Sequence, residues 1–267
     1  MLMSSMLIGA SLAASPVPPA ARQDVIPQDR YPALWVINDA DTVIYLFGTF
    51  HALDSRSEWF GQAVKTAFTE SDQLILETLV PRPELAPPPP PPVGAGNIER
   101  IPVARSSFLG DSNAVMKAGR SNGLSYDHGA DAVLRYAAAA AGKPVGELES
   151  FAFQIRMFSA LPPAPQAGAQ MVNGEDGMAA LLTQLKAAWN RGDIDSFSPM
   201  LMKMRDQSPQ MYRTLFVERN SRWAQWIAQR LETPGTVFVA VGAGHLSGPD
   251  SVQNQLAWRG VRSARVN

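Results

Sequence analysis

The chain has 267 residues, of which 46% are hydrophobic and 18% charged, enough for one domain with a sizeable buried core. Its 23 basic and 24 acidic residues give a formal net charge of −1, which argues against binding nucleic acid through a broad cationic surface. The absence of cysteine excludes disulfides, thiolate nucleophiles and cysteine-ligated zinc or iron–sulfur sites, and only His51, His128 and His245 can supply imidazole chemistry.

The N-terminal segment, residues 1–21, carries no charge, and its apolar run from Met6 to Ala14 is followed by prolines. This pattern is typical of a secretory signal peptide and predicts a periplasmic or secreted protein. The run is too short to cross a bilayer as a helix, so no stable membrane span is expected. Because no lysine or arginine precedes the run, a disordered tail rich in alanine and proline is the alternative.

The first half of the folded chain is predicted to combine strands with one helix. Two β-rich runs, 33–38 and 42–50, flank a short polar turn and predict a hairpin. An amphipathic helix over 60–68 and a buried strand over 73–79 follow, and this succession predicts local parallel pairing through a right-handed crossover. A proline-rich stretch at 87–97 is expected to form a solvated insertion or linker.

The middle of the chain is predicted to be helical, and strands return at the end. The buried strand 236–242 has a glycine-rich exit, and residues 261–266 form a closing strand. These elements predict an α/β (α+β) fold with a mixed, partly parallel sheet flanked by helices, in a single domain over 22–267. Predicted helices cover 111–120, 130–141, 150–159, 178–190, 194–205, 209–231 and 251–259, with a short strand over 143–148.

Two segments, LFGTFH and AVGAGH, share a pattern in which an apolar strand runs into Gly-x-x-His. We expect Gly48 and Gly242 to let the backbone turn as each strand ends, so that His51 and His245 follow at the same edge of the sheet. A single histidine at a sheet edge is more often structural, so the pairing of the two segments is what indicates a site. His128 is interpreted as a loop residue without a role.

Carboxylates are expected at the same edge. Glu77 ends the strand LILE, and either Glu147 or Glu149 follows the next short strand. Two imidazoles with two or three carboxylates predict a site for Zn²⁺, Mn²⁺ or Co²⁺, where bound water is activated and a spare glutamate acts as base. Alternatively, Glu77 caps a helix or pairs with an arginine, and the spacing of Glu218 and Arg222 predicts a surface ion pair.

Four segments in this order carry a family resemblance: LFGTFHALD followed by LILE, GADAVLRYAAAAAGKPVGELESFAFQ, VERNSRWAQWI, and VAVGAGHLSGPDSVQNQLAWRGVRSARV. Together they resemble the TraB/PrgY/GumN family, which includes the Tiki proteins. Asp131, Lys143, Glu149 and Gln154 fall on motif positions of the second segment, where Ser150 replaces the usual threonine. The resemblance extends over nearly the whole chain from Ala33.

The resemblance implies an EreA/ChaN-like fold and a metal-dependent hydrolase, most simply a metallopeptidase acting on a peptide or small-molecule substrate. By position it implies His51 and His245 as ligands of a divalent ion and Glu77 as a further ligand or general base. It also implies that Arg219 stabilises a developing oxyanion. The remaining implied pocket residues are Gly48, Glu149, Gln154, Glu218, Asn220 and Gly242.

The alternative function is a non-catalytic protein that binds a ligand, a haem-like cofactor or a peptide signal in the same cleft. The methionine-rich helical region around 200–211 would suit an apolar ligand. Peptide cleavage that a chelator abolishes would favour the enzyme, whereas saturable binding without turnover would favour the binding protein. The oligomeric state is not determined by these patterns.

Overall fold

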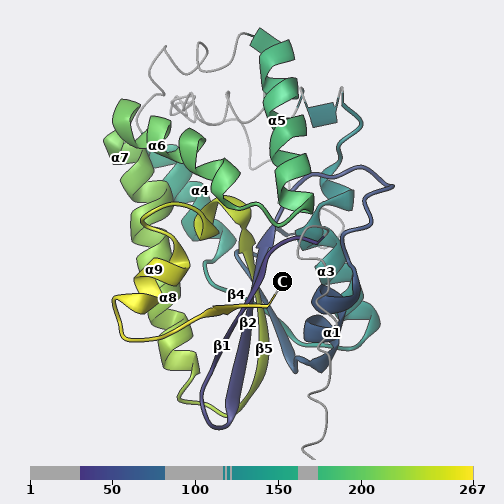
Figure 1. Ribbon diagram of the computed structural model, residues 1–267, viewed down its shortest axis with the longest axis vertical. Coiled ribbons are helices and arrows are strands. Elements are labelled where there is room, and N and C mark those ends of the chain that lie inside the picture. The colour runs from purple at the N-terminus through teal and green to yellow at the C-terminus, as the bar shows by residue number, and fades with distance from the viewer. Residues whose placement is uncertain (1–30, 82–116, 118, 121, 162–173, 267) are drawn as a thin grey trace, which may run out of the picture.

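The computed structural model describes residues 31–81, 117, 119–120, 122–161 and 174–266 (Figure 1). The predicted signal peptide, the proline-rich stretch at 87–97 and most of the predicted helix 111–120 lie outside the described residues, so the periplasmic or secreted location stays a prediction. Within the described residues, none of the helices combines the length and apolar character needed to cross a membrane.

Six strands of the described chain form one mixed sheet in the order β4-β3-β5-β2-β1-β6. The four strands β2, β5, β3 and β4 run parallel, while β1 and β6 pair antiparallel at one side. The predicted α/β fold is therefore confirmed. The strands are β1 Leu34–Asn38, β2 Thr42–Thr49, β3 Gln73–Leu76, β4 Val145–Glu147, β5 Gly235–Gly242 and β6 Ala264–Arg265.

The predicted hairpin is confirmed by the antiparallel pairing of β1 with β2. In its turn, the carboxylate of Asp39 accepts the backbone N–H groups of Asp41 and Thr42. The predicted direct pairing of the strands at 42–50 and 73–79 is wrong, because β5 lies between them and is parallel to both. Most of β5 is buried, as expected for an apolar strand at the centre of a sheet whose two faces are covered by helices.

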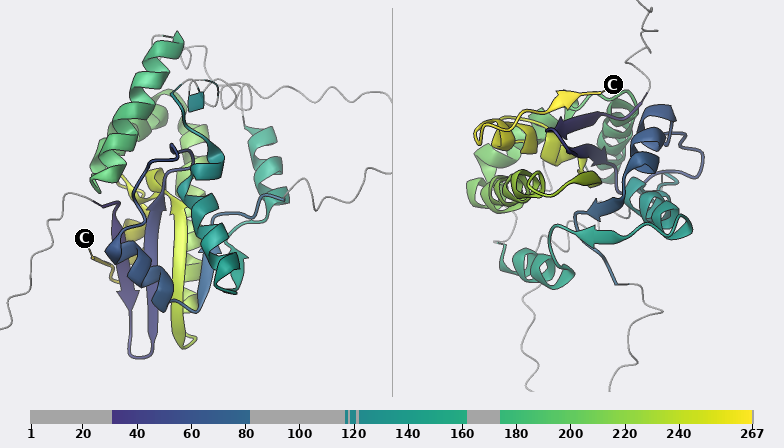
Figure 2. Two further views of the ribbon diagram at one scale, coloured as in Figure 1. Left: turned by 90° about the vertical axis from the view of Figure 1, so that its right-hand side faces the viewer. Right: turned by 90° about the horizontal axis from the view of Figure 1, so that it is seen from below.

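Helices cover both faces of the sheet. In Figures 1 and 2, α1 and α3 lie on one side and α8 and α9 on the other. The long helix predicted over 209–231 forms α7, a π-helical segment at Arg213–Val217 and α8. The helices are α1 Gln62–Glu70, α3 Ala130–Ala140, α4 Phe151–Ala160, α5 Gly174–Asn190, α6 Ser198–Gln207, α7 Pro209–Tyr212, α8 Glu218–Arg230 and α9 Val252–Ala257.

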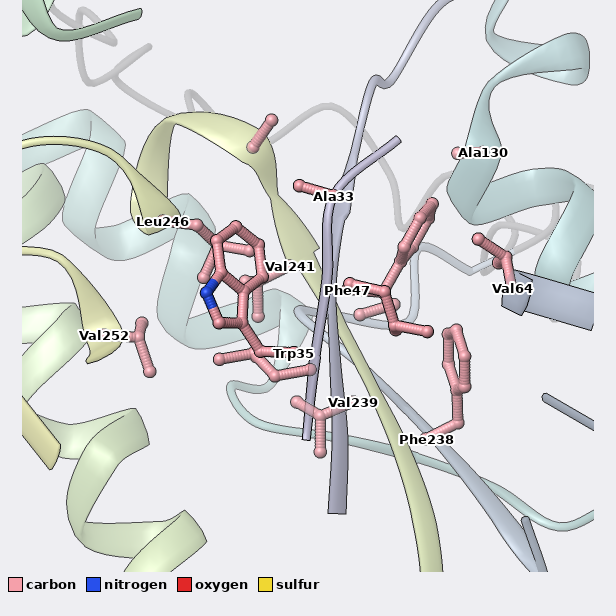
Figure 3. Close-up of a cluster of buried hydrophobic side chains, with 14 of the residues drawn as sticks. Ala33, Trp35, Phe47, Val64, Ala130, Phe238, Val239, Val241, Leu246 and Val252 are labelled. Carbon is pink, nitrogen blue, oxygen red and sulfur yellow. The ribbon is translucent and has the colours of Figure 1, made fainter. Parts of the chain in front are cut away.

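Alternating side chains of the strands form two apolar layers, one on each face of the sheet (Figure 3). Phe47 and Phe238 point toward α1 and α3. Val239 and Val241 point to the opposite face, toward the segment after β5 that contains Leu246 and Val252. The buried Trp189 of α5 packs edge-on against Phe47, and its indole N–H donates to the carbonyl of Gly48 (2.7 Å). This bond holds α5 against the carboxyl end of β2, where the candidate site lies.

Candidate functional site

The four parallel strands end at one edge of the sheet, and polar residues follow each of them. His51, Glu77 and His245 come after β2, β3 and β5, and Glu149 comes after β4. The backbone N–H of Glu149 donates to the carbonyl of Glu77 (3.1 Å), which keeps these two residues adjacent beyond the strands. Of the two carboxylates considered after β4, Glu149 joins this group, whereas Glu147 accepts a backbone N–H from the segment after β3 (2.7 Å).

The two motif glycines have different structural roles. Gly242 is the last residue of β5 and pairs with Thr49, so Gly48 lies one residue further inside its strand. A Cβ on Gly48 would lie 3.1 Å from the side chain of Leu246 and 3.3 Å from the Cα of Ala243. The expectation that both glycines turn the backbone is wrong for Gly48, which instead lets the 3₁₀ turn after β5 pack closely over β2.

His51 is oriented by Asp131, in the first turn of α3. The Nδ1 atom of His51 lies 2.7 Å from Asp131 Oδ2, and the other carboxylate oxygen accepts the hydroxyl of Thr49 (2.8 Å). The negative charge of Asp131 raises the pKa of His51 to about 9. At neutral pH His51 is therefore an imidazolium that donates from Nδ1 to Asp131 and carries a second proton on Nε2.

Gly129 allows α3 to begin close enough for this contact. A Cβ on Gly129 would lie only 2.0 Å from the carbonyl oxygen of His51, and the next residue, Ala130, donates its N–H to the carbonyl of Phe50 (3.0 Å). We expect Gly129→Ala to lower the free energy of unfolding by about 1–3 kcal/mol, because the clash is with backbone. Urea denaturation measures the loss, and Gly119→Ala is the control.

A Cβ on Gly119 has its nearest described neighbour at 3.8 Å, which is ordinary contact, so this control variant is expected to keep its stability. Equal stability of the two variants would show that α3 can shift away from His51 without cost.

Arg219, in the first turn of α8, is the cation at the centre of the site and is only 3% exposed. It pairs with Glu77 through Nη2 and with Glu149 through Nε (2.8 Å). Its Nη1 atom lies 3.4 Å from the carbonyl of Leu215 and 3.3 Å from His245 Nε2. Four of the five N–H groups of Arg219 thus have acceptors within the protein, which leaves little capacity for the implied oxyanion role.

Glu77 is held at both carboxylate oxygens. Oε1 accepts from Arg219 and from the side-chain amide of Gln154 (3.2 Å), and Oε2 accepts the backbone N–H of Gly242 (3.2 Å). Burial alone would raise the pKa of Glu77, but the positive charge of Arg219, together with that of the two nearby imidazoles when they are protonated in acid, outweighs burial and holds this pKa well below its usual range. Glu77 is therefore ionised at neutral pH.

Glu218 lies outside this cluster, contrary to the implied pocket role. Its carboxylate is exposed and pairs with Arg213 (3.1 Å), because adjacent helix positions point in different directions and Arg219 takes the buried one. The predicted surface pair between Glu218 and Arg222 is also wrong. Arg222 donates to the buried carboxylate of Glu149 instead (2.9 Å).

His245 is a buried, neutral acceptor. Its Nδ1 lies 2.6 Å from Asn220 Oδ1, and its ring lies between those of Phe216 and Trp223, with centroids 4.9 and 4.4 Å away. Burial, together with the charge of Arg219, lowers the pKa of His245 to about 3. The proton of the neutral ring therefore lies on Nδ1, facing Asn220, and the Nε2 lone pair faces Arg219.

One point in space, above the Cα of Gly242, lies close to both His51 and Glu77. A Cβ placed there would lie 2.9 Å from His51 Nε2 and 3.6 Å from Glu77 Oε2. An atom of a bound molecule at this point would contact both groups at once. The point adjoins a cavity of about 490 Å³, whose walls include His51, Gly242 and His245.

The comparison with protein families agrees with the motifs gathered at this edge. A model of the TraB/PrgY/gumN family matches residues 33–87 and 97–265. The chain belongs to this family. The family match is interrupted between 87 and 97, within the proline-rich stretch, and no curated protein and no solved structure matches the chain.

The divalent ion expected from the sequence motifs and the family resemblance would need the donors of His51, His245 and Glu77. Among the described residues, no group of three or more histidine, aspartate or glutamate side chains is arranged to hold a metal. The lone pair of His245 Nε2 faces Arg219, and one oxygen of Glu77 pairs with Arg219. In this arrangement the residues do not fit a divalent ion, and the expected metal stays a prediction.

The sequence-based interpretation assigned no role to Asp131 and gave Arg222 a surface role. Asp131 belongs to the Gly-x-Asp motif of the TraB/PrgY/gumN resemblance. This motif, at the first turn of a predicted helix, was the feature of the sequence that could have indicated a role for Asp131 in the site. No comparable local signal marks Arg222, because its partner Glu149 is 73 residues away in sequence.

Proposed function

We propose that this TraB/PrgY/gumN-family protein is a hydrolase, most simply a peptidase, whose reaction centre is the point above Gly242. The supporting observation is that His51 Nε2 and Glu77 Oε2 face this same point. Their surroundings push their pKa values apart, so that one group is protonated and the other ionised at neutral pH. An acid and a base that converge beside a cavity are suited to hydrolysis of a bound carbonyl compound.

The roles follow from the contacts. Glu77 accepts a proton from the attacking water as the water oxygen bonds to the substrate carbonyl carbon, and Arg219 and Gln154 keep the carboxylate oriented. His51 gives its Nε2 proton to the leaving amine as the C–N bond breaks, while Asp131 holds the ring in place. After turnover, the proton that Glu77 accepted can pass to His51 across the shared point, which restores both groups, and the 54% exposed side chain of His51 also exchanges protons with solvent.

Gly242→Ala tests the proposed centre directly. The backbone at Gly242 has φ −53° and ψ 135°, which alanine adopts readily, but the added methyl group would occupy the point shared by His51 and Glu77. We expect kcat/KM on an internally quenched peptide library to fall at least about 100-fold, since displacements of about 1 Å have such effects.

Gly244→Ala is the matched control, because its Cβ would have no described neighbour closer than 3.4 Å. We expect this control to lose at most a few-fold in kcat/KM. Failure of the wild-type protein to cleave any peptide in the library, or full activity of Gly242→Ala, would contradict the proposal.

Metal analysis tests the cofactor that the family resemblance implies. We expect the full-length protein, expressed with Zn²⁺, Mn²⁺ and Co²⁺ and then dialysed, to retain well under one ion per chain, because Arg219 already contacts Nε2 of His245 and one of the two carboxylate oxygens of Glu77. Peptide cleavage should then be insensitive to a chelator. One ion per chain, lost in His245→Ala, would instead support a metallopeptidase in which His51, His245 and Glu77 bind the ion.

A second candidate is a non-catalytic protein that binds a peptide or apolar ligand, and the largely apolar walls of the cavity favour it. The same library distinguishes the two functions. Saturable binding without any product, measured at enzyme concentrations that would reveal slow turnover, supports the binding protein.

A further inference from the structure

The cavity beside the reaction centre has the dimensions of a ligand site. Its volume of about 490 Å³ lies within the range of roughly 300–1,000 Å³ that is usual for sites binding small molecules. His51 and Gly242 belong both to the cavity wall and to the point where the acid and the base meet. A group that fills the cavity would therefore lie next to the bond that is attacked.

The wall of this cavity is largely apolar. Arg120 and Asp127 are charged lining residues outside the acid–base centre, and both are exposed to solvent. Among the described residues, the large apolar side chains of the lining are Phe50, Leu124, Leu182, Phe197, Met200 and Phe216. A charged substrate group against the apolar part of this wall would lose its hydration without gaining a partner there, whereas a large apolar group gains about 25 cal/mol for each Å² that it buries.

Phe216 lies where the cavity meets the buried part of the site. Its ring packs against His245, with centroids 4.9 Å apart, and stacks on Tyr212 at 5.7 Å. The hydroxyl of Tyr212 donates to Asp250 (2.8 Å), which restrains the ring on which Phe216 rests. Phe216 belongs to the π-helical segment, an irregularity that is frequent at functional sites.

We propose that the cavity binds a bulky apolar side chain of a peptide substrate, next to the bond that is hydrolysed, and that Phe216 limits the size of that side chain. The proposal rests on the hydrolase function proposed above. It adds a substrate class: peptides with phenylalanine, leucine or a similar residue at the bond, rather than lysine, aspartate or alanine.

Peptides of one sequence that differ only in the residue at the bond test this specificity. We expect kcat/KM for phenylalanine or leucine to exceed that for alanine by about 10–100-fold, the usual range for apolar pockets, and lysine and aspartate to be cleaved more slowly still. Phe216→Ala should raise the ratio of tryptophan to phenylalanine cleavage about tenfold. Trp258→Ala, which removes a ring that is 66% exposed on the surface, should keep the wild-type profile.

Binding provides a readout that does not depend on turnover. The full-length protein is titrated with N-acetyl-phenylalaninamide and with N-acetyl-lysinamide, and ligand-observed NMR measures the two dissociation constants. We expect saturable binding of the phenylalanine compound but not of the lysine compound. Met200→Glu, which places a carboxylate in the apolar wall, should raise the dissociation constant of the phenylalanine compound at least about tenfold.

The two readouts separate failure of the specificity from failure of the hydrolase. Cleavage without preference for apolar residues would overturn the inference and leave the proposed function standing. Selective binding without any cleavage would overturn the proposed function and keep the cavity as an apolar ligand site. Equal binding of both amides would overturn the inference whatever the activity.

Discussion

Arg219→Leu is expected to lower the free energy of unfolding by about 3–5 kcal/mol, the usual effect of removing one partner from a buried ion pair. Arg219 is the common cation of Glu77 and Glu149, and both carboxylates are largely shielded from solvent. Glu149 keeps a contact with Arg222, but Glu77 has no second arginine contact in the described network. Urea denaturation with the full-length protein measures the change.

Arg213→Leu is the matched control for Arg219. Arg213 lies in the preceding π-helical segment and also pairs with a glutamate, but its side chain is 74% exposed. Exposed pairs of this kind contribute about 0–1 kcal/mol, so this variant should be nearly as stable as the wild type. If both leucine variants lost the same small amount, Arg219 would not be the main compensating charge of the site.

A double variant separates the ion pair from the rest of the Arg219 environment. Glu77→Gln removes the carboxylate that depends most on Arg219, so the combination with Arg219→Leu should lose less than the sum of the two single changes. Additive losses would indicate that the contacts of Arg219 with Glu149 and Trp223, rather than its pair with Glu77, account for the effect.

His51→Ala is expected to lower kcat by about 10²–10⁴-fold on any peptide that the wild-type protein cleaves, which is the usual contribution of a positioned acid or base. Because its side chain is 54% exposed, the loss of stability should stay within about 1 kcal/mol. Asp131→Asn should also lower kcat, since the amide keeps the shape of the side chain but loses the charge that favours the imidazolium.

His128→Ala controls for the loss of an exposed imidazole. His128 lies in a 3₁₀ turn close in sequence to Asp131, and it is absent from the cavity wall among the described residues. The His128→Ala variant should keep the kcat and KM of the wild-type protein. Undiminished activity of His51→Ala would remove His51 from the proposed mechanism.

Local patterns were sufficient to predict the hairpin, the helix that contains Asp131 and the strands that end near His51 and His245. A strand of alternating or continuous apolar residues can be recognised from its own residues, because burial of those residues is what stabilises it. The order of the strands was not predictable in this way. The contact of β5 with β2 joins segments that are almost two hundred residues apart, and no short-range signal reports it.

The sequence by itself predicted that His51, Glu77, His245 and one of Glu147 and Glu149 lie just beyond strands, and parallel strands bring such residues to one edge. Only the tertiary structure decided which charges meet there. The direction of α8 buries Arg219 between two carboxylates and leaves Glu218 in solvent, although the two residues are adjacent in the chain. Side-chain direction depends on how a helix packs against the sheet, and this long-range packing places an arginine at the centre of the cluster that the strand ends bring together.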